Sequence, residues 1–218
     1  MPVAWNEDDP RDEAVLVRNL GQVLRELVQG SPLRQVPSVA MAQEWHRKIY
    51  EGIRLPVAYF AGEIRDSDPR FPELDGYEVQ VGRHLGMPSS QVPSELANYE
   101  AALREAVAVL DAEIPVGRYP DGPDQLLSLL TLLAYAHGEW VRIHPFANGN
   151  GRTARLWANW CALRYSLPAF VRLKPRPEGS LYANAAAASM DGDHQRMIAV
   201  FAEMLDQYLT LRPRRSAS

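Results

Sequence analysis

Residues 144–155 read HPFANGNGRTAR, and the physical chemistry of this stretch predicts how the chain folds around it. Pro145 disfavours a helical backbone at His144, so a helix that reaches this point has to end there. Gly149 and Gly151 permit positive φ angles and a close approach of the backbone, which is typical of a tight turn. The helical pattern resumes at Thr153. The stretch therefore predicts two helices joined by a glycine-containing turn.

The same stretch combines groups that suit the binding and transfer of a phosphate. The free N–H groups at the start of the second helix form an anion-binding nest. Arg152 and Arg155 are three residues apart, so both guanidinium groups reach one side of that helix, and guanidinium groups bind phosphate with paired hydrogen bonds. His144, with an ordinary pKa of ~6.5, accepts a proton near neutral pH. Together these groups predict a base beside a bound phosphate.

Hydrophobic periodicity predicts a mostly helical chain outside this stretch. The first expected helix starts at Asp9–Pro10 and ends at Gly30. A later helix is expected to be capped by Ser94, and the next to be capped by Asp124 and to end at Ile143. The other expected helices are 39–53, 153–166, 180–190 and 194–211. The helix that ends at Ile143 is apolar on nearly every side, so we expect it to be the central buried helix.

One segment has the two-residue period of a strand. Tyr77, Val79 and Val81 alternate with polar residues or glycine, and the upstream segment Tyr59–Arg65 is the expected partner strand. A single hairpin does not build a sheet domain. The expected fold class is therefore all-α, a helical bundle with a small β-hairpin.

Composition and charge limit the remaining possibilities. The 218 residues are 46% hydrophobic and 23% charged, which indicates one globular core, and the net charge of −4 argues against broad binding of nucleic acid. The acidic N-terminus does not resemble a signal peptide, and polar residues interrupt the most apolar stretch, so we expect no membrane span. Cys161 has no cysteine partner. We expect a cytoplasmic protein.

The motif resembles the signature HPFx(D/E)GNGR of the Fic (Fic/Doc) family. The similarity continues in residues 45–53, 61–65 and 77–81 and in the alanine-rich segment 182–193, so that it spans roughly 39–208. It implies a Fic-type helical bundle with a β-hairpin flap. We expect a helical extension over 1–38, a Fic domain over 39–211 and a disordered basic tail over 212–218.

The resemblance implies a protein adenylyltransferase, which moves AMP from ATP to a Ser, Thr or Tyr hydroxyl of a target protein. His144 would deprotonate that hydroxyl, and Phe146 would anchor the loop as a buried residue. The other implied roles are phosphate binding by Gly149, Asn150, Gly151, Arg152 and Arg155, and docking of the target segment at the flap residues Gln80, Val81 and Gly82.

Asn148 stands where the family has an acidic residue that binds Mg²⁺. An amide oxygen is a neutral ligand, whereas proteins usually hold Mg²⁺ with carboxylates together with phosphate oxygens. We therefore expect a weakened Mg²⁺ site. Three interpretations stay open: an attenuated AMP transferase, a transferase of another phosphate-linked group, and a nucleotide-binding regulator without transfer activity.

The sequence does not contain the family's internal inhibitory motif, (S/T)xxx(E/D)(G/N). Three possibilities for inhibition of the activity therefore stay open: inhibition by a separate antitoxin-like subunit, inhibition by Asn148 itself, or no inhibition. His46 is expected to be a hydrogen-bonded core histidine. Glu63 and Arg65 border the expected flap, where a surface ion pair and a role in binding are equally compatible with the sequence.

Overall fold

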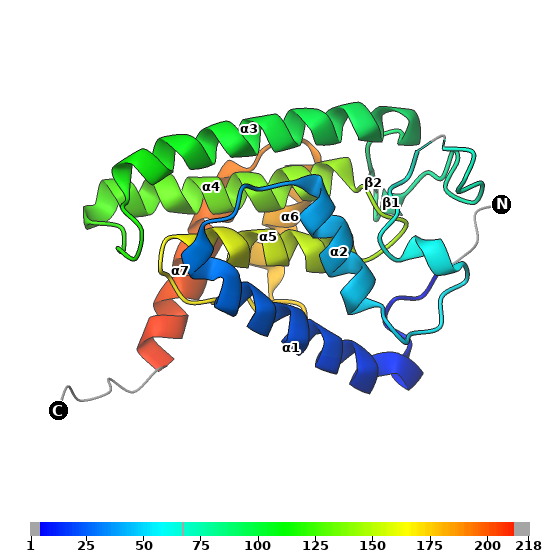
Figure 1. The fold of residues 1–218 in the computed structure, drawn as a ribbon, viewed down its shortest axis with the longest axis horizontal. Helices are drawn as coiled ribbons and strands as arrows, with labels where there is room; N and C mark the ends of the chain where they lie inside the picture. Colours follow the sequence, from blue (N-terminus) through cyan, green and yellow to red (C-terminus); the bar gives the residue numbers. More distant parts are fainter. Residues whose placement is uncertain (1–4, 67, 212–218) are drawn as a thin grey trace.

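The computed structural model describes residues 5–66 and 68–211, which form a mainly helical protein (Figure 1). The α-helices in these residues are α1 (Glu13–Gly30), α2 (Val39–Ile49), α3 (Val92–Glu113), α4 (Gly122–Ile143), α5 (Asn150–Arg164), α6 (Ser180–Met190) and α7 (Gln195–Leu211). Short 3₁₀ helices cover Pro10–Asp12, Ser31–Leu33, Ala58–Phe60 and Ser89–Gln91. This confirms the expected all-α class.

Helix α4 lies at the centre of the bundle, as its apolar sequence predicted. It packs against α3, α5, α6 and α7, while α1 packs against α2 and α5. In Figure 1, α3, α4 and α5 run side by side along the long axis of the molecule. The end of α4 and the start of α5 are therefore held by helices on several sides.

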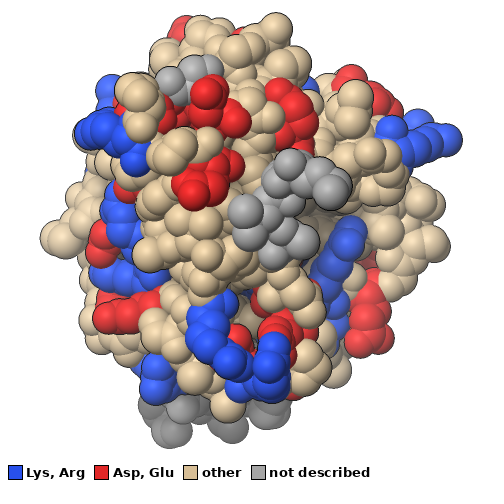
Figure 2. Space-filling view, turned by 90° about the vertical axis from the view of Figure 1, so that its right-hand side faces the viewer, with Lys and Arg blue, Asp and Glu red and all other residues tan. Residues whose placement is uncertain are grey.

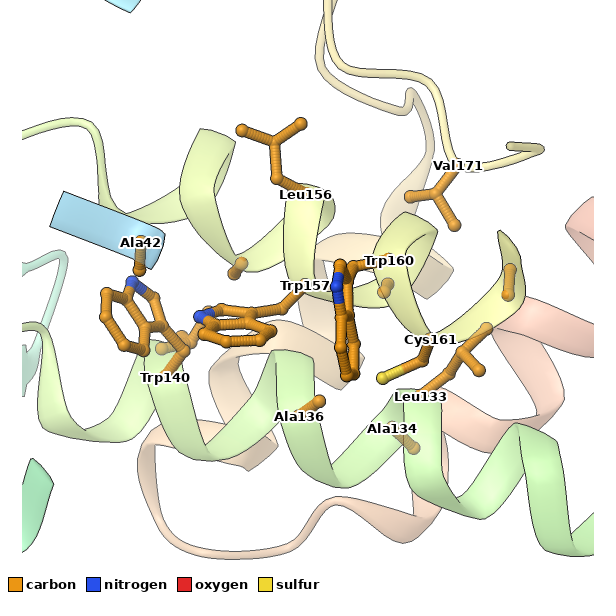
Figure 3. Packing of buried hydrophobic residues seen from close by; sticks show 14 of the residues in the cluster. Ala42, Leu133, Ala134, Ala136, Trp140, Leu156, Trp157, Trp160, Cys161 and Val171 are labelled. Carbon is orange, nitrogen blue, oxygen red and sulfur yellow. The ribbon is translucent and has the colours of Figure 1, made fainter. Parts of the chain in front are cut away.

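The contact between α4 and α5 is filled by large aromatic side chains (Figure 3). Trp140 and Trp157 are fully buried, with ring centroids 6.0 Å apart, and Trp45 of α2 packs edge-on against Trp157. Small residues such as Ala136 leave room for these rings. Because interiors are close-packed, this contact fixes the position of the turn between the two helices.

The hairpin differs from the one expected. Strand β1 (Gln80–Val81) pairs in antiparallel fashion with β2 (His84–Leu85), which follows it in the chain. Gly82 supplies the positive φ, 60°, that the two-residue turn needs. The expected partner, Tyr59–Arg65, is wrong as a strand, because part of it forms the 3₁₀ helix Ala58–Phe60.

Several helix ends also differ from expectation. Helices α3 and α4 begin before Ser94 and Asp124, because Pro93 and Pro123 already have the backbone angle of a first helical turn. Helix α2 ends four residues early, close to the turn where Gly52 has φ 74°. The expected tail, 212–218, lies outside the described residues. None of the helices in 5–66 and 68–211 combines the length and the hydropathy required to cross a bilayer.

Candidate active site

His144 ends α4 in the left-handed conformation, with φ 54° and ψ 56°. Its Nδ1 lies 2.8 Å from the carbonyl oxygen of Val141, and the partly buried residue lines a cavity at the start of α5. Because a carbonyl oxygen only accepts, Nδ1 carries the proton in the neutral ring and Nε2 is left as an acceptor. Burial lowers the pKa of His144 to about 4, so the ring is neutral at pH 7.

The turn after His144 is fixed by its own side chains. Phe146 is fully buried and stacks on His46, with ring centroids 3.8 Å apart. The Asn150 side chain bonds both backbone groups of Phe146, accepting from the N–H at 2.9 Å and donating to the carbonyl at 2.8 Å. The side chain of Asn150 therefore holds the turn closed. Asn150 also lines the cavity at the start of α5.

Gly149 lies behind the cavity and lets the turn pass close to α2. Its φ is 78°, and a Cβ atom at this position would lie 2.4 Å from the Tyr50 hydroxyl and 2.7 Å from Nε2 of His46. His46 is fully buried; its Nε2 donates to the Asn148 carbonyl at 3.0 Å and its Nδ1 accepts from the Gly62 N–H at 2.9 Å. It is a hydrogen-bonded core histidine, as expected.

Arg152 and Arg155 both reach the cavity from the first turns of α5, and both are buried. Arg155 donates to the carbonyl of Leu173 at 2.9 Å and to the hydroxyl of Tyr182 at 3.4 Å. Among the described residues these hydrogen-bond partners of Arg155 are neutral, whereas Arg152 is paired with carboxylates. The two arginines of the motif therefore differ in the charge that surrounds them.

The carboxylates on Arg152 come from the N-terminal segment. Glu7 forms an ion pair with Nη1 of Arg152, and the Asp8 carboxylate lies 2.6 Å from Nη2. The Tyr50 hydroxyl donates to Glu7 at 2.7 Å. Burial disfavours charge on Asp8, but Arg152 and Lys174 outweigh burial and lower its pKa. Sequence reasoning missed these residues, because nothing local relates an acidic N-terminus to a motif some 145 positions later.

Asn148 is committed to local hydrogen bonds. Its Oδ1 accepts from the Gly149 N–H at 2.9 Å, and its Nδ2 donates to the carbonyl of Trp5 at 2.9 Å. The one oxygen that could face a cation is thus already an acceptor, and it carries no charge. This donor set does not fit a Mg²⁺ site of the usual kind.

Arg65 is a fully buried cation that connects the flap to the motif. It donates to the carbonyls of His144 at 2.8 Å, Tyr77 at 2.7 Å and Met87 at 2.9 Å. Burial lowers its pKa to about 10, and Glu78 opposes that shift. Of the two interpretations left open for Arg65, a surface ion pair is wrong, because the guanidinium that lies 3.7 Å from the Glu78 carboxylate is fully buried. Glu63 does form a surface ion pair, with Arg47 at 3.5 Å.

A cavity of about 510 Å³ brings most of the expected site residues together. Its lining includes His144, Asn148, Asn150, Gly151, Arg152, Arg155 and the flap residue Val81. Gln80 and Gly82 lie on the hairpin outside this lining, and Phe146 and Gly149 lie behind it. Lys174 and Arg176, from the segment between α5 and α6, and Tyr182 of α6 complete the wall. The lining thus includes a base, several cations and a helix N-terminus, together with the carboxylates of Glu7 and Asp8.

Acidic and basic side chains are interspersed on the face that carries the hairpin, so this face has no broad basic field (Figure 2). Inside the cavity the cations Arg152, Arg155, Lys174 and Arg176 outnumber the carboxylates of Glu7 and Asp8. This distribution suits a small anionic group better than a nucleic-acid backbone.

A sequence model of the Fic/DOC family matches residues 37–162, which is more than half of the chain. The chain belongs to the Fic/DOC family. It is 35% identical over 78 residues to the protein adenylyltransferase Fic of Drosophila persimilis, and 33% identical over 78 residues to that of Drosophila melanogaster. These matches cover 36% of this chain and only 15% of either relative.

Solved structures share the fold. A Fic domain containing signaling protein from Bacteroides thetaiotaomicron superimposes with a TM-score of 0.63 at 20% identity, over 90% of this chain and 70% of the other. The N-terminal Fic domain of a Bartonella effector protein gives a TM-score of 0.57 at 14% identity, over 92% of this chain and 86% of the other. At these identities the similarity establishes the fold alone.

Proposed function

We propose that this protein is a Fic-type adenylyltransferase, which transfers AMP from ATP to a Ser, Thr or Tyr hydroxyl of a target protein. The observation that carries the proposal is the convergence of His144, Arg152 and Arg155 on one cavity at the start of α5. Adenylyltransferase relatives support the same reaction. The cavity is large enough for a small ligand and lies beside the exposed hairpin.

The target hydroxyl oxygen attacks the α-phosphorus of ATP, the bond to the β-phosphate oxygen breaks, and pyrophosphate leaves. Nε2 of His144 takes the hydroxyl proton, because Nδ1 already donates to Val141. Arg152 and Arg155 stabilise negative charge on the phosphates, which is the main contribution that a protein makes to this class of reaction.

The flap suits a target segment in extended conformation. In the described residues β1 pairs only with β2, and its two residues are exposed. Addition of a strand uses main-chain hydrogen bonds, so it would position a target without selecting its sequence. Nδ1 of His84, in β2, lies 3.2 Å from a carboxylate oxygen of Asp191. This contact holds the hairpin over the cavity. An antitoxin-like inhibitor remains a second proposed partner.

Intact-mass measurement tests the proposal directly. Wild type and His144→Ala are incubated with ATP and Mg²⁺, alone and with a cell lysate, and proteins are searched for an added AMP unit. We expect the addition with wild type and its loss with His144→Ala. Circular dichroism of the variant controls for folding. Absence of any AMP-modified protein with wild type, at ATP concentrations where binding is measured, would reject transfer.

One observation favours a second function, that of a nucleotide-binding module that does not transfer. Asn148 gives the site no carboxylate of the kind that holds Mg²⁺, and its side chain already bonds to Gly149 and Trp5. In that case ATP binding would be measurable in wild type, and Asn148→Asp would not produce transfer.

A further inference from the structure

One carboxylate oxygen in the cavity lies between two cations. Oδ1 of Asp8 is 2.6 Å from Nη2 of Arg152 and 3.1 Å from Nζ of Lys174. The neighbouring Glu7 carboxylate accepts from Nη1 of Arg152 and from the Tyr50 hydroxyl. An arginine fork and a lysine that converge on anionic oxygens are the usual ligands of a phosphate.

We propose that Arg152 and Lys174 form a phosphate subsite, and that Glu7 and Asp8 occupy it as internal competitors of the nucleotide. Lys174 thereby becomes a phosphate ligand outside the sequence motif. The N-terminal segment becomes a built-in restraint on ATP binding. The inference rests on the proposed nucleotide site, and its test separates the two.

Lys174 is placed for this role by the segment after α5. The preceding residue, Leu173, accepts a hydrogen bond from Arg155 at 2.9 Å, so Lys174 adjoins the second arginine of the motif. Its side chain is mostly buried, with 18% exposed, and pairs with Asp8 and, at 3.6 Å, with Glu13. The subsite of Arg152 and Lys174 is thus continuous with Arg155 within one cavity.

The acidic segment is anchored by groups other than its carboxylates. The Trp5 ring packs edge-on against the Tyr50 ring, with centroids 4.7 Å apart. The backbone carbonyl of Trp5 accepts a hydrogen bond from Nδ2 of Asn148. An aspartate at position 148 would have no N–H to donate to that carbonyl. The amide at this position therefore supports the docked segment.

A phosphate group cannot share Arg152 with Glu7 and Asp8, because like charges at this distance repel and the donors of one guanidinium are limited. ATP then binds only the fraction of molecules in which the segment has left. Its apparent affinity is lowered by that fraction. Neutralising Glu7 and Asp8 should remove the competition.

Titration calorimetry with ATP, and separately with inorganic pyrophosphate, tests the inference on the full chain. The double variant Glu7→Gln/Asp8→Asn should bind either ligand about tenfold more tightly than wild type. Asp12→Asn is the matched control, because it removes a nearby carboxylate, whereas the described ion pairs of Arg152 are with Glu7 and Asp8, and it should bind like wild type.

Lys174 is tested in the double variant, where its carboxylate partner Asp8 has been neutralised. Adding Lys174→Gln there should weaken binding about fivefold, through the loss of one charge-assisted contact. Lys48→Gln, a lysine of α2 paired with Glu26 and Glu44, controls for lost charge and should leave binding unchanged.

Unchanged binding by the double variant would overturn the restraint, and weaker binding would show instead that the carboxylates assist the ligand, as metal ligands would. Unchanged binding on adding Lys174→Gln would overturn the subsite. Tighter binding of ATP and pyrophosphate by the double variant, without AMP transfer by any variant, would retain the inference and reject the proposed function.

Discussion

The Nε–H of Arg65 donates a 2.8 Å hydrogen bond to the carbonyl oxygen of His144, the residue that ends α4. The same guanidinium donates to Tyr77 and Met87 on either side of the hairpin. One buried cation therefore links the flap to the proposed base. The flap and the base are expected to move together, or not at all.

Arg65→Met should destabilise the protein by about 3 kcal/mol, because it leaves several buried carbonyl oxygens without a donor. Urea unfolding measures the free energy of unfolding. Arg70→Met is the control, since Arg70 lies on the same segment but is exposed, where it pairs with Asp68 and lies over the Phe71 ring. If Arg65→Met lost no more free energy of unfolding than Arg70→Met, the buried hydrogen bonds of Arg65 would contribute little to stability.

Gly149→Ala should cost more stability than Gly117→Ala. Both glycines have nearly the same positive φ, 78° and 74°, so both variants carry the strain of a left-handed alanine, about 1 kcal/mol. Only at position 149 does the new Cβ meet other atoms, at 2.4 Å from the Tyr50 hydroxyl, which adds roughly 1–3 kcal/mol. Urea midpoints measure the difference, and equal losses would contradict the close approach.

His144 should titrate near pH 4 rather than near its ordinary value. Burial disfavours the charged ring, and the Arg65 charge acts in the same direction, while the hydrogen bond to Val141 opposes both. Proton NMR of the ring C–H groups measures the titration, with the signal assigned by its loss in His144→Gln. A midpoint near 6.5 would mean that the ring is solvated.

Stability should fall as the pH is lowered from about 6.5 toward 4. His46, His137 and His144 all have lowered pKa values, about 3, 3 and 4. Between the folded and unfolded pKa values the unfolded chain binds more protons, so acid favours unfolding, by up to ~1.4 kcal/mol per pH unit for each ring. Urea midpoints at pH 7.5 and pH 5 measure the loss. Equal midpoints would contradict it.

Asn148→Asp should loosen the N-terminal segment, because the variant loses the donor to Trp5 and places a carboxylate against that carbonyl. Hydrogen exchange at residues 5–9 should become faster. Asn98→Asp, which makes the same charge change on the exposed side of α3, is the control. Unchanged exchange at residues 5–9 would show that the amide does not hold the segment.

The helical fold could be predicted from the sequence because its signals are local. Apolar periodicity located each helix, and the all-apolar character of α4 identified the centre of the bundle. The starts of α3 and α4 differ from the prediction, because Pro93 and Pro123 begin these helices before the capping residues Ser94 and Asp124. The predicted partner of the flap strand, Tyr59–Arg65, is wrong, because strand pairing depends on the turn Gly82–Arg83. The alternation of polar and apolar side chains does not indicate where such a turn lies.

The sequence by itself determined the family, the turn between α4 and α5, and the base and arginines at that turn, because all of these are encoded in one contiguous stretch. Only the tertiary structure decided which charges meet there. Glu7, Asp8, Arg65 and Lys174 lie far from the motif along the chain, and packing alone brings them to it. Electrostatic interactions act over a few ångströms of space rather than along the sequence, so the charge state of the site is a property of the folded molecule.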